Sequence, residues 1–343
     1  MKKFVQWVMA ATLVSGASLF TACGNDVVDN PVPPEKTIAI DKANFPDDNF
    51  REYLLDQDYG QDGVLTEREI MNITEMDVYD MEISSLQGIE YFTALTVLDC
   101  DDNELTTLDI SKNTALVKLY CSWNHLTSLD ITNNVALKSL LCYDNELTSL
   151  DVSKNTALTF LDCEENKITA LDVSMCTELE SLTCGDNELT QLDISNLTYL
   201  ESLNCNDNYL TTLDVSSNPN LEYLKCYDNQ LSSLDISNNP NLWLVFCDGN
   251  QISSLDFTNN PLLSFVSLTR NKISGQNMDA IITSLAQNDN PEAYIFDVID
   301  YSEGDEENVC TKSQVAALKA KGWTPRYYNE EEDEWTEYEG SDE

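Results

Sequence analysis

Cysteine recurs at a fixed interval through the centre of the chain, where thiols could form disulfides or bind a metal ion. The eight positions lie 21 residues apart and are Cys100, Cys121, Cys142, Cys163, Cys184, Cys205, Cys226 and Cys247. Each thiol alternates with leucine, which places it in an inward-facing column of parallel, stacked side chains. Parallel stacking is unsuited to disulfides, and tetrahedral metal sites need ligands that converge from different directions. We therefore predict free, buried thiols that pack as small hydrophobic side chains.

Aspartate recurs with the same period, always followed by Ile, Val or Phe and then by Ser or Thr. The column consists of Asp109, Asp130, Asp151, Asp172, Asp193, Asp214, Asp235 and Asp256. Stacked carboxylates repel each other unless hydrogen bonds or cations compensate. Two interpretations remain open: each carboxylate accepts a hydrogen bond from the backbone two residues on, in an Asx turn, or the column binds a file of Ca²⁺ ions.

Residues 58–69 offer a second candidate calcium site. The stretch matches an EF-hand loop at ligand positions one, five and twelve and at the turn glycine. In this arrangement Ca²⁺ would be held by Asp58, Asp62, the Val64 carbonyl and Glu69. Gly60 stands where position three needs a side-chain oxygen, so such a site would be weak and structural in role.

The same loop has an interpretation without calcium. Asp62 and Gly63 are typical of a turn, and Thr66 followed by Glu69 is the signature of a capping box that starts a short helix. Both interpretations remain open. Beyond this structural Ca²⁺, the sequence predicts no cofactor.

No set of residues assembles a catalytic centre. His125 is the only histidine, and it takes a solvated position that holds Glu or Lys in other repeats. The chain lacks a nucleophile elbow, a phosphate-cradling loop and a His-based metal cluster, and its many carboxylates single out no acid–base pair. We therefore predict that the protein is not an enzyme.

The spacing also predicts the elements that carry these columns. Asn follows each ladder Cys by three residues, from Asn103 to Asn250, and recurs at Asn271, where Leu268 replaces the thiol. The unit reads L-x-C-x-x-N-x-L-x-x-L-D-I-S-x-N-x-x-L-x-x. Its first residues alternate as a short strand, and stacked coils would join these strands into one parallel sheet. The Asn amides are expected to satisfy backbone groups of their own coil and of the next.

This motif resembles the leucine-rich-repeat family, and within it the 21-residue internalin type that carries a Cys ladder. The resemblance covers residues 76–275. It implies a right-handed, curved solenoid with a parallel β-sheet on its concave face, a mostly irregular convex side, and partner binding on the concave face. The degenerate coil at Met76 is expected, because terminal repeats are atypical.

Short segments are predicted to close both ends of the solenoid. Residues 41–75 read as a helical, EF-hand-like cap, with one helix after Pro46 and another after Thr66. Residues 276–343 read as a small α/β cap with an acidic tail. Its expected helices cover 278–286 and 312–321, and its expected strands 293–299 and 323–328. Residues 335–338 either add an edge strand or fray.

The N-terminus is typical of an exported protein. Two lysines precede an apolar run and a Thr-Ala-Cys23 sequence that resembles the lipobox of a bacterial, Bacteroidetes-like lipoprotein. Residues 1–22 are then a signal peptide, Cys23 is lipidated, and residues 23–40 form a stiff tether. This predicts a cell-envelope protein in the outer membrane, held by its lipid alone and facing either the periplasm or the cell surface. An ordinary cleaved signal is the alternative.

The charge balance limits the partners. The chain has 61 acidic and 18 basic residues, which gives a formal net charge of −43. Such acidity repels nucleic acid and anionic lipid surfaces. It fits cationic partners or divalent metal ions.

Two groups of outward strand residues form the predicted binding face. The first consists of Tyr120, Leu141, Tyr143 and Phe160, and the second of Tyr223, Lys225, Tyr227, Leu244, Phe246 and Phe265. Between them lie the small polar residues Ser181, Thr183, Gly185, Ser202, Asn204 and Asn206. Exposed aromatic rings on a rigid sheet suit an interface.

We therefore predict that a monomer binds a macromolecule on its concave face, a protein first of all, in an adhesin-like or recognition role. A carbohydrate-binding accessory role, in which the polar gap captures polysaccharide, is the alternative function. A further alternative is that the rings only shield one another or meet the C-terminal segment.

Overall fold

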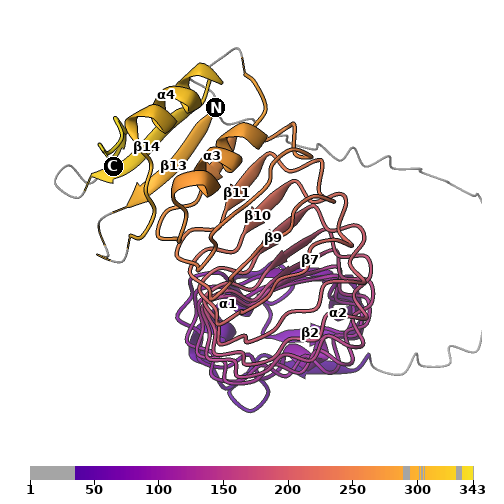
Figure 1. Cartoon of the computed structure of the whole chain (residues 1–343). Helices are drawn as coiled ribbons and strands as arrows, with labels where there is room; N and C mark the ends of the chain where they lie inside the picture. The colour runs from indigo at the N-terminus through magenta and orange to yellow at the C-terminus, as the bar shows by residue number, and fades with distance from the viewer. Residues whose placement is uncertain are drawn as a thin grey trace, which may run out of the picture. The chain divides into compact units, whose positions relative to one another are not determined.

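Thirteen strands line up in one sheet in the computed structural model, which describes residues 35–288, 294–300, 302, 304, 306–329 and 334–342. The strands follow sequence order from β3 (Glu75–Asp77) to β15 (Glu334–Glu337). All neighbours are parallel except β14 and β15, which are antiparallel. Figure 1 shows the coils stacked one beside the next, from the indigo end to the orange end. The leucine-rich-repeat solenoid expected from the sequence is confirmed.

The repeat strands are three residues long and keep a constant register. They are β4 (Val97–Asp99), β5 (Lys118–Tyr120), β6 (Ser139–Leu141), β7 (Phe160–Asp162), β8 (Ser181–Thr183), β9 (Ser202–Asn204), β10 (Tyr223–Lys225), β11 (Leu244–Phe246) and β12 (Phe265–Ser267). Each residue pairs with the one 21 positions later, as Leu119 does with Leu140. The central leucine or valine of each strand is buried, and its neighbours face outward. We call this outward side, the predicted concave face, the sheet face.

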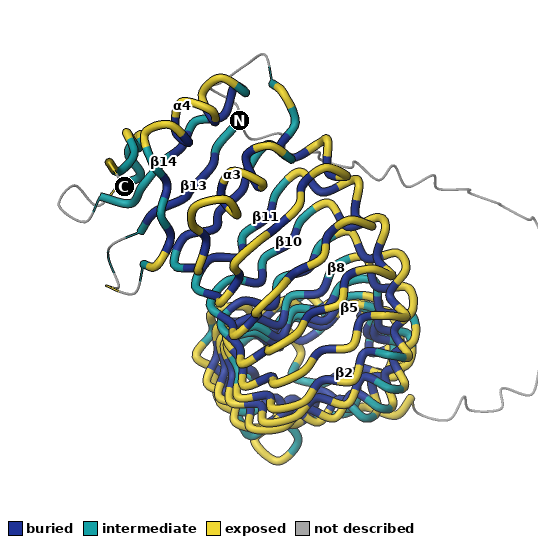
Figure 2. The backbone as a smooth tube through the Cα atoms, viewed as in Figure 1, coloured by how far each residue is buried: buried dark blue, intermediate teal, exposed yellow. Residues whose placement is uncertain are grey.

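Burial alternates along every coil, and Figure 2 shows this as dark-blue stretches inside and yellow turns outside. The inward leucines and thiols join into one continuous core from the first coil to the last. A single coil could not bury these residues alone, so the stability of each coil depends on its neighbours.

The Asn column is part of the backbone hydrogen-bond network. Asn145 donates through Nδ2 to the carbonyls of Cys121 at 2.9 Å and Cys142 at 3.2 Å. Its Oδ1 accepts from the Leu126 amide at 2.9 Å. Equivalent bonds to two coils recur from Asn103 to Asn271. The structural role predicted for this column is confirmed.

All ten cysteines that the structure describes are free and buried, including Cys176 and Cys310 outside the ladder. Burial is the main cause that raises the pKa of the ladder thiols well above their usual range. Several of these thiols also donate weakly to a carbonyl of the next coil, as Cys163 does to Thr183 at 3.6 Å. They are hydrophobic packing groups, as the sequence predicts.

We expect these thiols to be unreactive in the folded protein. The thiolate is the nucleophile, and burial suppresses both its formation and its access to reagent. Titration with an aromatic disulfide reagent at pH 8 should release ten more thiolate equivalents in 6 M guanidinium than in buffer, about one for each described cysteine. A smaller difference would mean that some of these ten cysteines are bridged or exposed.

The N-terminal cap consists of β1 (Thr37–Ala39), α1 (Asp48–Asp56), β2 (Val64–Thr66) and α2 (Glu67–Asn72). Asp47 joins it to the first coil: Oδ1 accepts from the Phe50 amide at 3.0 Å, and Oδ2 accepts from the Ser84 amide at 2.9 Å. Gly88, at φ 106°, leaves room for the buried Phe45 ring, because a Cβ at Gly88 would lie 2.3 Å from it. Both predicted helices are present.

The cap is larger than predicted at its N-terminal side. Residues up to 40 were assigned to the tether, but β1 pairs with β2 and belongs to the folded unit that begins at Lys36. Local sequence did not predict this strand, because its partner, β2, comes later in the chain, beyond α1. The predicted signal peptide and Cys23 lie outside the described residues. Among the residues described, no helix is long and apolar enough to cross a bilayer.

The C-terminal cap contains α3 (Gly275–Ser284), β13 (Ile295–Asp300), α4 (Lys312–Ala320), β14 (Thr324–Asn329) and β15. Strands β13 and β14 extend the repeat sheet in parallel, and β15 is the edge strand that the sequence left open. Asn308 continues the Asn column from an irregular segment, because its Nδ2 donates to the Leu268 carbonyl at 2.8 Å and its Oδ1 accepts from the Ile273 amide at 2.9 Å.

Candidate binding face

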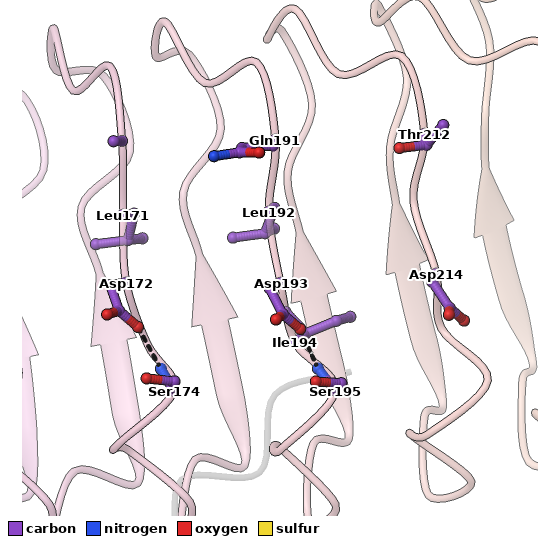
Figure 3. Close-up of a pocket in the computed structure, with 11 residues that line it drawn as sticks. Leu171, Asp172, Ser174, Gln191, Leu192, Asp193, Ile194, Ser195, Thr212 and Asp214 are labelled. Carbon is purple, nitrogen blue, oxygen red and sulfur yellow. Dashed lines mark hydrogen bonds between the residues drawn. The ribbon is translucent and has the colours of Figure 1, made fainter.

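The recurring Asp column forms Asx turns in all eight repeats. Asp172 accepts from the Ser174 amide at 3.0 Å, and Asp193 accepts from the Ser195 amide at 3.0 Å. Hydrogen bonds from the side chain of each serine, and then from its amide, lower the pKa of both carboxyl groups. Figure 3 shows the two bonds at the edge of a hollow of about 670 Å³ on the solenoid surface. Each carboxylate turns toward its own coil, so the Asx interpretation explains this column without calcium.

The EF-hand-like loop shows the turn and the capping box. Glu69 accepts from the Thr66 amide at 2.8 Å, and Asp62 accepts from the Val64 amide at 3.1 Å. Asp58 Oδ1 accepts from the side-chain nitrogen Nε2 of Gln61 at 3.4 Å. In the described part of the chain, no three His, Cys, Asp or Glu side chains are placed to hold a metal ion. Calcium binding by Asp58, Asp62, Val64 and Glu69 stays a prediction.

The first aromatic cluster is half-buried and is completed by a residue that the sequence analysis missed. Tyr120, Leu141, Tyr143 and Phe160 all face outward with intermediate exposure. Trp123 lies edge-on to Tyr143, with ring centroids 4.8 Å apart, and is 44% exposed. Trp123 extends this cluster as its most exposed ring.

Trp123 takes an unusual backbone position. The residue before each ladder Asn adopts a left-handed conformation, with φ near 50° in every repeat coil. The other occupants are Asp102, Asp144, Glu165, Asp186, Asp207, Asp228, Gly249 and Arg270. Asp and Gly adopt this conformation at a lower energetic cost than a bulky ring does. The sequence signal for Trp123 is that a tryptophan replaces the Asp found before the ladder Asn in most other coils.

The second cluster already contains a cation of its own, Lys225. The ammonium of Lys225 lies 5.5 Å from the Tyr223 ring centre and 5.7 Å from that of Phe246. The Phe246 and Phe265 rings pack with centroids 4.7 Å apart. Trp243, 44% exposed, lies beside Tyr223 and was also missed. Tyr227 and Leu244 face outward next to them, half-buried.

The C-terminal cap covers the end of this second cluster. Arg326 of β14 lies over Phe265 at 5.7 Å and over Trp335 at 5.4 Å, and it pairs with Asp297 through Nε at 2.7 Å and a terminal nitrogen at 2.9 Å. The alternative in which the rings meet the C-terminal segment is therefore correct for Phe265. The remaining rings of the cluster stay on the sheet face.

A small hollow of about 250 Å³ lies where the cap meets the sheet face. It is lined by Tyr227, Asp228, Phe246, Asp248, Phe265, Ser267, Thr269, Arg270, Asp297, Asp300, Arg326 and Trp335. At its base, Asp248 is buried and accepts hydrogen bonds from Ser267 Oγ and from the Thr269 amide and hydroxyl. Burial raises the pKa of Asp248 to about 6. Local patterning could not reveal this hollow, because five strands and the turn after a sixth contribute to it.

The polar gap between the clusters is not an open cleft. Gly185 and Asn206 are buried, while Ser181, Thr183, Ser202 and Asn204 are half-buried. The Glu164 side chain reaches past one coil and accepts from Asn204 Nδ2 at 2.9 Å. The reason is that the long side chain of Glu164, in the turn after β7, extends across the small residues of the next coil.

Carboxylates dominate the charge of the sheet face. Burial is the main cause that raises the pKa of both Asp101 and Asp162 to about 6, and neighbouring carboxylates add to the shift. Burial likewise raises the pKa of Glu164 and Asp186. The face therefore combines exposed aromatic rings with a strongly negative field.

Comparison with known proteins agrees with the Cys ladder and the sheet. A solved structure of the functional domain of InlJ from Listeria monocytogenes, described as including a cysteine ladder, superposes with a TM-score of 0.61. It covers 80% of this chain and 70% of that domain, at 29% identity. The chain has an internalin-like leucine-rich-repeat fold.

Other relatives agree with the internalin-like assignment. Internalin J of Listeria monocytogenes serotype 4b (strain F2365) is 34% identical over 132 residues, which cover 33% of this chain and only 14% of that protein. An internalin C2 structure from L. monocytogenes strain 4b F2365 shares the fold, with a TM-score of 0.58 and 24% identity over 62% of this chain and 97% of that one. A family model described as LVIVD repeat matches residues 183–207, about one internalin-like coil.

Proposed function

We propose that this protein binds a protein partner through its sheet face, in an adhesin-like or recognition role. Trp123 carries the proposal, because it is a large, exposed ring in the turn that directly follows a strand of a rigid sheet, and aromatic anchors of this kind dominate binding energies. The internalin-like fold supports a role in protein interaction. A partner that contacts the rest of the sheet face would also meet the carboxylates beside each aromatic cluster.

The conformation of Trp123 favours a functional role over a packing role. A left-handed backbone costs a bulky residue about 1 kcal/mol or more. Trp123 lies at φ 48° and contacts Tyr143 at the surface, outside the core. An Asp at this position would avoid the strain, as it does in neighbouring coils. A tryptophan at this strained position is expected where the cost of the strain is offset by contacts that the ring makes with a partner.

The remaining features of the proposal rest on the sequence. A binding role without catalysis fits a face of aromatic rings and carboxylates. We propose a monomer whose Cys23 carries the lipid anchor and holds it in the cell envelope, at the outer membrane. Protease treatment of intact cells would release the solenoid only if it faces outward.

The test is capture of a partner by the wild type and by Trp123→Asp. The variant installs the residue that other coils use, so its melting temperature should match or exceed that of the wild type, while partner affinity falls about tenfold or more. Affinity capture from the native environment, followed by a binding titration of the captured protein, measures the effect. Tyr199→Asp is the matched control, because Tyr199 is 56% exposed away from the sheet face.

Equal capture by wild type and Trp123→Asp would refute the proposal. Capture that Tyr199→Asp also abolishes would point to a different surface. Trp123-dependent binding to a glycan array, with no protein captured, would replace the protein partner with a polysaccharide.

A further inference from the structure

We propose that the protein partner inserts a lysine side chain into the hollow of about 250 Å³ between the C-terminal cap and the sheet face, where its ammonium group pairs with Asp248. This inference rests on the proposed function and adds the chemistry of one contact. It places that contact beside the second aromatic cluster, several coils away from Trp123.

The hollow has room for one side chain. Small-molecule sites usually measure about 300–1,000 Å³, so a volume of about 250 Å³ suits a single extended side chain better than a larger ligand. The walls include the rings of Phe246 and Phe265, whose centroids lie 4.7 Å apart, and the Trp335 ring of β15. A lysine would pack its methylene chain against these rings and keep its charged end for a polar partner.

Asp248 provides the polar partner. It lines the hollow and is 8% exposed. Its Oδ1 accepts from the Ser267 hydroxyl and from the Thr269 amide and hydroxyl. Its Oδ2 accepts from no residue that the structure describes, and the enclosed polar atoms without a partner do not include it. One oxygen of this carboxylate is therefore left for a charge-assisted hydrogen bond from a ligand.

The charges that line the hollow favour a further cation. Four carboxylates line it, but only two guanidinium groups, those of Arg270 and Arg326. Arg326 is engaged by Asp297 at 2.7 and 2.9 Å, and Arg270 by Asp228 at 2.9 Å. Among the described residues no Lys or Arg pairs with Asp248, and no lysine of this chain lines the hollow. Asp248 is thus the carboxylate that lacks a counter-ion.

Asp248 is costly to the fold unless a cation reaches it. Burial raises the pKa of this carboxyl group to about 6, so the group carries its charge at neutral pH at the expense of folding stability. An asparagine would keep the acceptor for Ser267 and Thr269 without this cost. A buried charge at such a position is expected where a ligand compensates it.

A single available oxygen suits an ammonium group better than a guanidinium group or a metal ion. The guanidinium fork favours two acceptor oxygens, which Arg326 finds on Asp297, whereas an ammonium group acts as a compact point charge. Three metal-binding side chains converge nowhere in the described ranges. The nearby rings also accept cations, since Arg326 lies over Phe265 at 5.7 Å and over Trp335 at 5.4 Å.

The test is a ¹⁹F NMR titration of the whole protein labelled with 5-fluorotryptophan. Trp335 lines the hollow and reports on it, and Trp335→Phe assigns its resonance. The probe is Nα-acetyl-lysine N-methylamide, and its Nε-acetylated form is the neutral match. We expect the lysine probe to shift the Trp335 resonance with half-saturation in the millimolar range, as a single side chain can reach. The neutral probe should leave this resonance unchanged.

Asp248→Asn should weaken binding of the lysine probe about tenfold, the size expected for one charge-assisted hydrogen bond. The matched control is Asp101→Asn. Asp101 holds the same position in its repeat, is also buried, and has a pKa that burial raises to about 6, but it lies at the other end of the sheet. Its replacement should change the affinity less than about twofold, because the charge is distant and screened. Thermal melts check that both variants fold.

Three results would overturn the inference: no saturable shift of the Trp335 resonance up to about 50 mM probe, equal shifts from the neutral probe, or equal losses in Asp248→Asn and Asp101→Asn. The last would show that only diffuse charge attracts the probe. If a partner captured through Trp123 binds Asp248→Asn with wild-type affinity, the proposed function stands and the lysine contact is wrong. If the probe binds in the hollow but no partner depends on Trp123, the reverse holds.

Discussion

Replacing Asn145 with alanine should lower the free energy of unfolding by about 3 kcal/mol, because buried backbone groups of two adjacent coils lose the hydrogen-bond partner that the Asn145 side chain provides. Asn145 Oδ1 satisfies the Leu126 amide, and its Nδ2 bonds to carbonyls of two coils. Alanine leaves the buried Leu126 amide without an acceptor. Urea unfolding followed by circular dichroism measures the loss.

The control for this prediction is Asn133→Ala in the adjacent coil. Asn133 is exposed, so the same change of side chain should alter stability by less than about 0.5 kcal/mol. Similar losses in both variants would mean that the Asn column contributes nothing beyond the intrinsic cost of the substitution. A loss in Asn145→Ala of under 1 kcal/mol, on the scale of one ordinary hydrogen bond, would also contradict the prediction.

The second large effect is a gain in stability. Asp248→Asn should raise the free energy of unfolding at pH 7.5 by up to about 3 kcal/mol, the cost of ionising a carboxyl group whose pKa moves from 3.8 to about 6 on folding. The side-chain oxygen that accepts from Thr269 is kept in the amide. The variant therefore removes the buried charge and retains the hydrogen bonds.

The pH dependence has a definite sign. Because folding raises the pKa of Asp248, its contribution is most favourable below pH 3.8, where the group is protonated in both states, and is lost as pH rises through about 6. The difference between Asp248→Asn and the wild type should thus vanish near pH 4 and grow up to pH 7.5. A difference that is independent of pH would refute this account.

Asp172→Asn provides a contrast of opposite sign. Hydrogen bonds from Ser174 lower the pKa of this exposed carboxyl group, so its contribution is present above pH 3.8 and lost on acidification. Asparagine should therefore be neutral or destabilising at pH 7.5, and the difference should shrink at low pH. Thermal melts of Asp248→Asn and Asp172→Asn across pH 3 to 8 distinguish the effect of a buried charge from that of an exposed carboxylate in an Asx turn.

The repeat sequence alone was enough to predict the solenoid, its parallel sheet and the role of its Asn and Cys columns. The reason is that a side chain's direction in a strand follows from local alternation, and the same local answer recurs in every coil. Helices α2 and α4 of the caps could be predicted for a similar reason. Their capping boxes, Thr66 with Glu69 and Thr311 with Gln314, involve residues close together in the sequence.

The details of the binding face were decided by the tertiary structure. Glu164 meets Asn204 across two coils, Arg326 reaches Phe265 from the cap, and Asn308 joins the Asn column from a segment with no repeat phase. Local patterning cannot supply such contacts, because they depend on coil spacing and on how the cap docks. The sequence therefore determined which residues face outward, and only the stacking of coils decided which of them are free to bind.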